Sequence, residues 1–144
     1  MLRVTKIHPY KKNDDETKLP FFTSKIKAGF PSPADSYLQK KLDLNELLID
    51  DAESTYFVEV SGESMKDAGI LDGDILIVNK SKSPKNDDII IAVVNGDLTV
   101  KRYVKKNNGE TYLMAENPDY PPIELGGEME TSCWGVVTAS VHRF

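Results

Sequence analysis

Ser64 is the residue of this chain whose position best suits nucleophilic chemistry. It lies in Ser61-Gly62-Glu63-Ser64-Met65, where a predicted β-strand ends at Gly62 and a turn or short helix begins. A hydroxyl at such a junction can be exposed while nearby backbone N–H groups remain free to stabilise an oxyanion. The same position is typical of a serine that caps a helix, so the pattern alone leaves both interpretations open.

A serine hydroxyl needs a base, and Lys101 is the candidate. The two histidines, His8 and His142, lie near opposite ends of the chain, and no pattern places either beside Ser64. A lysine amine can serve when burial disfavours its charged form and lowers its pKa. Strand alternation puts Lys101 on the face of Thr99, which does not decide between a buried and a solvated amine.

Other candidate groups carry weaker signals. Ser24 and Lys27 have an S-x-x-K spacing, but they lie in an irregular segment and no K-T-G sequence accompanies them. Asp72 and Asp74 flank a glycine, which favours a turn over a catalytic carboxylate pair. Cys133 is the single cysteine, so no internal disulfide is possible, and it is interpreted as a core thiol. No metal-ligand spacing occurs, and no cofactor is expected.

Short strands linked by glycine and proline turns must position these groups. Asn95-Gly96 is a strong two-residue hairpin signal between two of them. Leucines within 36–48 predict one or two short helices. The pattern indicates a mainly β body of coiled antiparallel sheets. The predicted strands cover 56–60, 75–78, 89–94, 98–104, 112–114 and 134–141.

The charge is unevenly divided along the chain. Residues 1–28 contain seven Lys/Arg against three Asp/Glu, a net of +4, whereas residues 29–144 contain eleven against twenty, a net of −9. The total of −5 argues against a general nucleic-acid binder. Residues 1–28 show no sustained period, so they are either a solvated tail or an extended arm that folds back on an acidic body.

Residues 29–33 contain two prolines and a glycine, which predict an extended, accessible segment of the kind that suits a protease substrate. The longest apolar run, 89–94, is too short to cross a bilayer, and the N-terminus lacks the apolar segment of a secretory signal. We therefore expect a cytoplasmic protein without a membrane anchor.

Four segments, in matching order and spacing, resemble the LexA/UmuD family of self-cleaving serine peptidases. Ser61 to Met65 resembles the nucleophile motif, and Asp97 to Lys101 resembles the strand that carries the catalytic lysine. The other two are 29–34 followed by 43–45, and 69–78. The resemblance runs from about residue 21 to residue 141. It implies a β-clip peptidase body with a short N-terminal helix and an extended arm.

The resemblance also implies the roles of the site residues. Ser64 would be the nucleophile, Lys101 the base, and the backbone N–H groups of Glu63 and Ser64 the oxyanion hole. The cut would fall between Ala28 and Gly29, separating a 1–28 arm from a 29–144 peptidase and dimerisation domain. UmuD proteins often carry Cys-Gly at this bond; Ala-Gly is the LexA-type pair.

By the same resemblance the protein would be a homodimer of the SOS response. A RecA–single-stranded DNA filament would promote self-cleavage, and the shortened dimer would join a UmuC-type polymerase in translesion synthesis. The alternative is a LexA-like repressor. It is disfavoured because the first 28 residues lack the helical periodicity of a sequence-specific DNA-binding part. An inert interaction module is disfavoured because Ser64 and Lys101 are both intact. A membrane-bound signal peptidase is disfavoured because no membrane anchor is expected.

Overall fold

The computed structural model describes residues 2–11, 19–22, 39–127 and 130–144, without the side chains of 19–22 and 39–42. The chain divides into two compact units. One comprises Met1–Lys11 with Asp51–Phe144, and the other comprises Lys12–Asp50. None of the helices within the described ranges has the length and apolar character needed to cross a membrane.

The smaller unit contains β2 (Leu19–Phe22), β3 (Gln39–Leu42) and α1 (Leu44–Leu48). Asp43 begins the helix by accepting the N–H of Asn45 at 2.9 Å. The helix predicted over 36–48 is therefore confirmed only for 44–48, and 36–38 lie outside the described residues. The prediction is wrong for 39–42 because β3 pairs with β2 about twenty positions away, a partner that local periodicity does not reveal.

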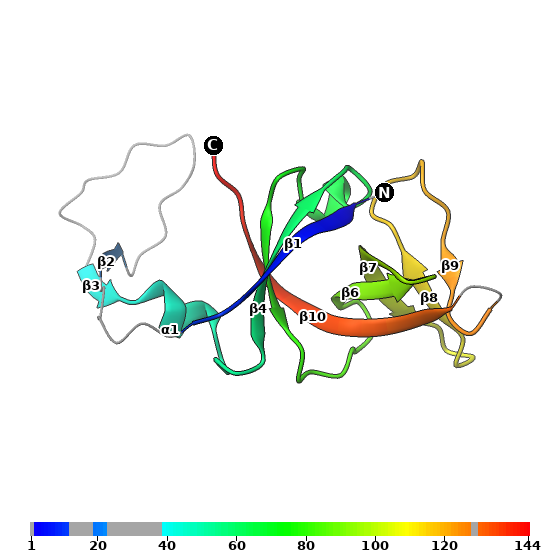
Figure 1. Cartoon of the computed structure of the whole chain (residues 1–144), viewed down its shortest axis with the longest axis horizontal. Coiled ribbons are helices and arrows are strands. Elements are labelled where there is room, and N and C mark those ends of the chain that lie inside the picture. The colour runs from blue at the N-terminus through cyan, green and yellow to red at the C-terminus, as the bar shows by residue number, and fades with distance from the viewer. Residues whose placement is uncertain (1, 12–18, 23–38, 128–129) are drawn as a thin grey trace. The chain divides into compact units, whose positions relative to one another are not determined.

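The larger unit is an antiparallel sheet, which confirms the mainly β prediction (Figure 1). Among the described residues its order is β1-β4-β5-β10-β6-β7-β8-β9. The strands are β1 (Arg3–Pro9), β4 (Thr55–Ser61), β5 (Ile75–Asn79), β6 (Ile89–Val94), β7 (Asp97–Lys105), β8 (Thr111–Met114), β9 (Ile123–Glu124) and β10 (Thr131–Val141). A short 3-10 helix, η2 (Lys66–Ala68), follows β4.

β1 closes part of this sheet into a barrel. It runs antiparallel to β4 over most of its length, and Arg3 also pairs with Thr99 of β7. The strands from β1 round to β7 therefore form a ring. The sequence does not predict β1, because residues 1–28 show no sustained period.

The β6–β7 hairpin forms where the sequence predicts it. Val94 pairs with Asp97, and the two residues between them, Asn95 and Gly96, have φ of 49° and 87°. Positive φ at both central positions is what a tight hairpin of this kind requires.

β6 is apolar throughout because both of its faces are buried. Ile91, with Ile89 packed against the same cluster, joins one core with Val58, Met65 and Val100. Ile90, Ala92 and Val94 join a second core. The alternation of side chains along the strand thus separates two apolar clusters.

β10 spans the larger unit, pairing with β6 through its first half and with β5 through its second half. Its register shifts between Cys133 and Gly135. The interpretation of Cys133 as a core thiol is wrong. Its side chain is exposed, whereas the neighbouring Trp134 packs against the core, as the alternation of side chains along a strand requires. Gly135 is required by space, since a Cβ there would lie 2.6 Å from Cγ1 of Val78.

Candidate active site

The turn that carries Ser64 is fixed just before the serine. Gly62 has a φ of 114°, a conformation that favours glycine, and its N–H donates to Oδ1 of Asp72 at 2.8 Å. Met65, not Ser64, is the capping position of η2, and no side chain caps that helix. Ser64 therefore lies between a strand end and a helical turn as predicted, and the helix-cap interpretation is wrong.

The hydroxyl of Ser64 is hydrogen-bonded to the backbone of Leu2, in the first part of the chain. The N–H of Leu2 donates to Oγ of Ser64 at 2.6 Å, and the carbonyl of Leu2 accepts from the Thr99 hydroxyl at 2.6 Å. Ser64 and Leu2 are both 0% exposed. A hydroxyl at such a junction can be exposed, but this one is buried, and Leu2 joins Ser64 to β7.

Lys101 is buried in β7, opposite Ile90 of β6, and is 1% exposed. Its Nζ lies 5.7 Å from the ring centroid of Tyr120. Burial lowers the pKa of the Lys101 amine, because removal from water disfavours the charged form. The question that strand alternation left open is therefore resolved in favour of a buried amine.

Two links connect the Ser64 turn with the part of β7 that holds Lys101. The first is Leu2, which is bonded to Ser64 and to Thr99, two residues before Lys101 and on the same strand face. The second is the loop after β8. Its Asn117 donates to the carbonyl of Glu63 at 3.0 Å, and its Tyr120 faces Lys101. A direct bond between Ser64 and Lys101 stays a prediction.

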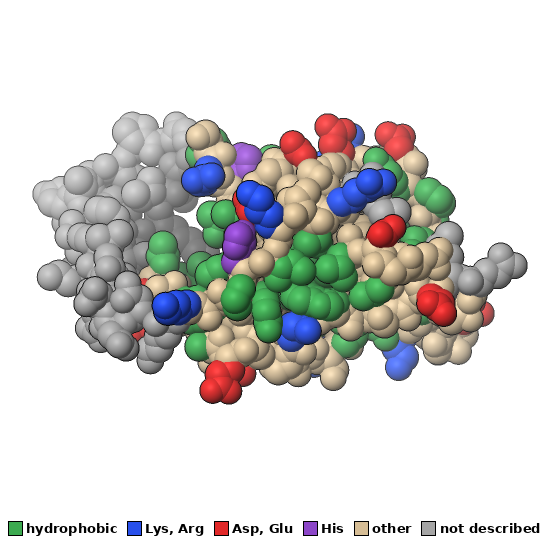
Figure 2. All heavy atoms as spheres, in the orientation of Figure 1, with side chains coloured by type: hydrophobic (Ala, Val, Ile, Leu, Met, Phe, Trp, Pro, Cys, Tyr) green, Lys and Arg blue, Asp and Glu red, His purple; other side chains and the backbone are tan. Residues whose placement is uncertain are grey.

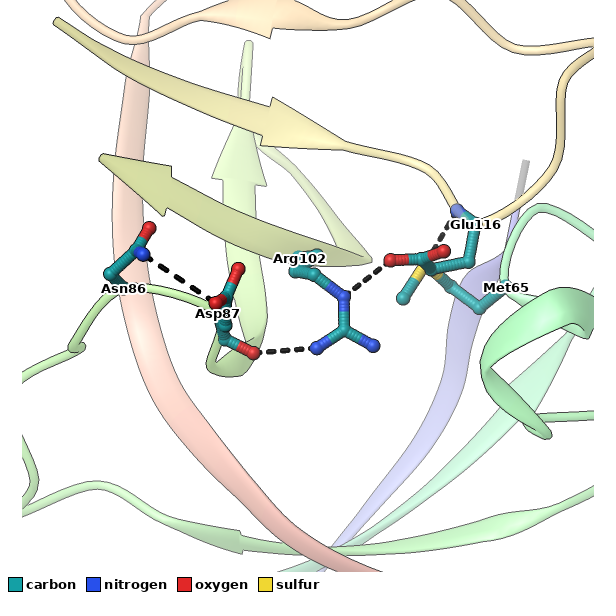
Figure 3. A network of polar contacts seen from close by, with 5 residues as sticks. All are labelled: Met65, Asn86, Asp87, Arg102 and Glu116. Carbon is teal, nitrogen blue, oxygen red and sulfur yellow. Dashed lines mark hydrogen bonds and ion pairs between the residues drawn. The ribbon is translucent and has the colours of Figure 1, made fainter. Parts of the chain in front are cut away.

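This loop is held to β7 and to the Ser64 turn by polar contacts (Figure 3). Arg102 forms an ion pair with Glu116 and also donates to the carbonyl of Asp87 at 2.6 Å. The N–H of Glu116 contacts Sδ of Met65 at 3.4 Å, and the Glu116 carbonyl accepts from the N–H of Asp67 at 2.9 Å. Met65 is fully buried and directly follows Ser64, so these contacts tie the loop to the nucleophile turn.

The two aspartates near the turn have structural partners. Asp72 accepts from Gly62, as described above, and Asp74 accepts from the N–H of Leu71 at 2.9 Å. Asp74 is 1% exposed and also contacts Nδ1 of His142 at 2.5 Å. The turn interpretation of this pair is confirmed.

The remaining predicted positions are not described. The cleavage site (Ala28 and Gly29) and the S-x-x-K pair (Ser24 and Lys27) lie outside the described residues. The cleavage site therefore stays a prediction, and the S-x-x-K pair stays a weak alternative.

Neither Leu2 nor Asn117 is predicted by the sequence to take part in the site. Leu2 reaches its partners across 62 and 97 positions, and Asn117 reaches Glu63 across 54. No local sequence pattern predicts contacts between residues so far apart along the chain.

A mainly β body with a buried serine at a strand-to-helix turn and a buried lysine with a lowered pKa fits the serine–lysine class of peptidases. Residues 20–138 match the family model described as Peptidase S24-like. The chain therefore belongs to the Peptidase S24-like family of self-cleaving serine peptidases, as the motif resemblance indicated.

Individual relatives cover most of the chain. Protein ImpA of Salmonella typhimurium is 37% identical over 131 residues, which span 90% of this chain and 88% of the relative. Protein SamA of the same species is 40% identical over 128 residues, or 89% and 88% of the two chains. LexA repressor 1 of Pseudomonas syringae is 35% identical over 123 residues, 85% of this chain but only 59% of the repressor.

Proposed function

We propose that this protein is a self-cleaving serine–lysine endopeptidase that cuts its own Ala28–Gly29 bond. The observation that carries the proposal is the burial of Lys101. A lysine that is 1% exposed, with its pKa lowered by desolvation, is suited to act as a base. Its strand is bonded through Leu2 to the hydroxyl that it would activate.

The reaction follows from these groups. Neutral Lys101 takes the proton of Ser64 as Oγ attacks the carbonyl carbon of Ala28. The N–H groups of Glu63 and Ser64 hold the oxyanion. Collapse of the tetrahedral intermediate breaks the C–N bond, and Lys101 gives its proton to the amine of Gly29. Water then attacks the acyl-enzyme, with Lys101 as base, and regenerates Ser64.

The Ser64 hydroxyl has to be uncovered before this can happen. Because Ser64 is 0% exposed, residues that cover it must move before a carbonyl can approach within bonding distance. Leu2, which is bonded to Oγ, is one of them. Slow cleavage of the resting chain is the expected consequence, and it agrees with a need for a promoting partner.

We place this activity in the SOS response, in the cytoplasm. A RecA–single-stranded DNA filament promotes the cut, and the shortened homodimer joins a UmuC-type polymerase for translesion synthesis. Support comes from the motif resemblance and from family membership. Apolar side chains gather near the centre of the face seen in Figure 2, and patches of this kind mark interfaces.

A LexA-like repressor is the second candidate, because the chain matches LexA repressor 1 over 59% of that protein. The shared part would then be the peptidase, with transcription as the process that it controls. Binding of the uncut chain to short duplex DNA of defined sequence, lost after the cut, would favour this candidate over the mutagenesis assignment.

The test is mass spectrometry of the purified full chain after incubation at alkaline pH, and separately with RecA filaments. The wild type should yield a fragment ending at Ala28 and a body beginning at Gly29. Ser64→Ala should lower the rate by about 10⁴-fold or more. Ser83→Ala, at an exposed serine, is the matched control and should cut normally. Undiminished processing in Ser64→Ala would refute the proposal.

A further inference from the structure

We propose that Asn117 is a positioning residue that orients the Ser64 N–H toward the oxyanion. This inference rests on the peptidase function proposed above. Asn117 is 5% exposed, and its Nδ2 donates to the carbonyl oxygen of Glu63 at 3.0 Å. That carbonyl belongs to the same peptide group as the N–H of Ser64, which is one of the two predicted oxyanion donors.

Because the peptide group is planar, a hydrogen bond that holds the carbonyl of Glu63 also fixes the direction of the N–H of Ser64. No cis peptide bond occurs among the described residues, so the C=O of Glu63 and the N–H of Ser64 point in opposite directions. A second donor, the N–H of Lys66, reaches the same oxygen at 3.2 Å. Two donors on one carbonyl restrict rotation of the peptide plane, and thereby fix the direction in which the Ser64 N–H points.

Asn117 is itself held in place. Its Oδ1 accepts from the N–H of Asp119 at 3.1 Å, and its carbonyl accepts from the N–H of Tyr120 at 3.1 Å. Because the amide oxygen is engaged as an acceptor, the amide nitrogen is the group left to donate to Glu63. Glu116, the preceding residue, is bonded to the same turn through its backbone. Both the oxygen and the nitrogen of the Asn117 side-chain amide are therefore hydrogen-bonded.

The proposed role differs from that of the base. Asn117 bonds the peptide on the N-terminal side of Ser64 and not the hydroxyl, so its loss leaves proton transfer to Lys101 intact. What is lost is the fixed direction of an oxyanion donor. Deleting such a donor outright lowers catalytic rates by about 10²–10³-fold. Misorienting one should cost less, about 10–100-fold.

The experiment compares pH profiles of self-cleavage in the full chain. Asn117→Ala removes the donor, and Asn117→Leu removes it at nearly constant size and without a new charge, in case the alanine variant folds poorly. Both should lower the high-pH plateau about 10–100-fold and leave the midpoint of the profile unchanged. Asn79→Ala is the matched control. Asn79 is 6% exposed, fixes a turn through Ser81, and lies at the end of β5 that pairs with the start of β4, away from Ser64.

Three results would overturn the inference. One is cleavage by Asn117→Leu within about twofold of the wild type. Another is a shifted midpoint with an unchanged plateau, which would mean that Asn117 acts through Lys101. The third is an equal rate loss in Asn79→Ala, which would indicate general destabilisation. Failure of the proposed function looks different, because the wild type would then not cut or Ser64→Ala would still cut.

Discussion

Lys101 places an amine where water is largely excluded, and this determines its chemistry. The neutral form is the one that can accept a proton from Ser64. Burial raises the neutral fraction at any given pH because it lowers the pKa of the amine. The side chain is thus prepared as a base by the fold itself.

The rate of self-cleavage should therefore rise with pH and reach its plateau before the ordinary lysine pKa of about 10.4. Below the lowered pKa the neutral fraction grows about tenfold per pH unit, and above it the fraction is constant. Timed mass spectrometry at pH 6 to 11, without RecA, gives the profile. A rate that still climbs tenfold per unit through about pH 10.4 would indicate an exposed lysine or a different base.

The same burial should reduce stability at neutral pH. The folded pKa of Lys101 lies below the unfolded one, so the unfolded state binds more protons between the two values. The penalty is full below the folded pKa and disappears above the unfolded pKa of about 10.4. In a Ser64→Ala background, Lys101→Met should therefore raise the free energy of unfolding at pH 7, and the gain should shrink toward pH 10.4. Urea titrations measure both.

Lys105→Met is the control for this prediction, since Lys105 is an exposed residue on the same strand. It should change stability little at any pH. If Lys101→Met is less stable than the parent at pH 7, packing or hydrogen bonding of the amine outweighs its desolvation.

At the residue scale, the sequence identifies the candidate residues but not their surroundings. Ser64 and Lys101 stand in local motifs that can be recognised without coordinates. The burial of Lys101 could not be predicted, because alternation gives a shared face and not what covers it. Leu2 and Asn117 were missed because each makes a hydrogen bond, between a backbone group and a side chain, to a residue more than fifty positions away.

At the element scale, predictability depended on how local the pairing is. The β6–β7 hairpin was predictable because Asn95 and Gly96 encode the turn. β1 and β3 were not, since their partners β4 and β2 lie far along the chain. Register shifts within β10 likewise depend on its pairing with β5 and β6, which no local pattern encodes. The error at Cys133 has another cause: an apolar run does not reveal which of two neighbouring side chains faces the core.

β10 offers a test of packing at Gly135. A Cβ at this position would lie 2.6 Å from Cγ1 of Val78, which is fully buried. Gly135→Ala should therefore destabilise the fold by about 1–3 kcal/mol. Val78→Ala removes the clashing methyl, so the double variant should be more stable than the sum of the single changes implies, by about 0.5–3 kcal/mol. Chemical unfolding of the four proteins gives the cycle.

Gly127→Ala is the matched control, because the nearest atom to a Cβ there is at an ordinary 3.4 Å and no unusual φ is involved. It should be close to neutral. Strict additivity of the Gly135 and Val78 changes would show that the two sites do not contact in solution.

At the scale of the whole molecule, the proposed cut and the observed packing are in tension. The compact unit contains residues 1–11, and β1 closes the ring between β4 and β7. Cutting after Ala28 would separate this strand covalently from the body. The proposed arm is therefore also a structural part of the barrel, and its removal would free one edge of β4.

The cut body should consequently be less stable than the intact chain. Ser64→Ala in the full chain and in residues 29–144 gives a pair that differs only in the arm. Loss of Leu2, which is 0% exposed in the core, should alone lower the free energy of unfolding by about 2–5 kcal/mol. Urea unfolding measures the difference, and amide exchange should show new exposure along β4. A synthetic peptide of residues 1–11 should restore part of the loss, whereas the same peptide with Leu2→Asp should not. Equal unfolding midpoints for the two proteins would mean that β1 contributes nothing to the barrel, and that the arm can leave Ser64 without cost.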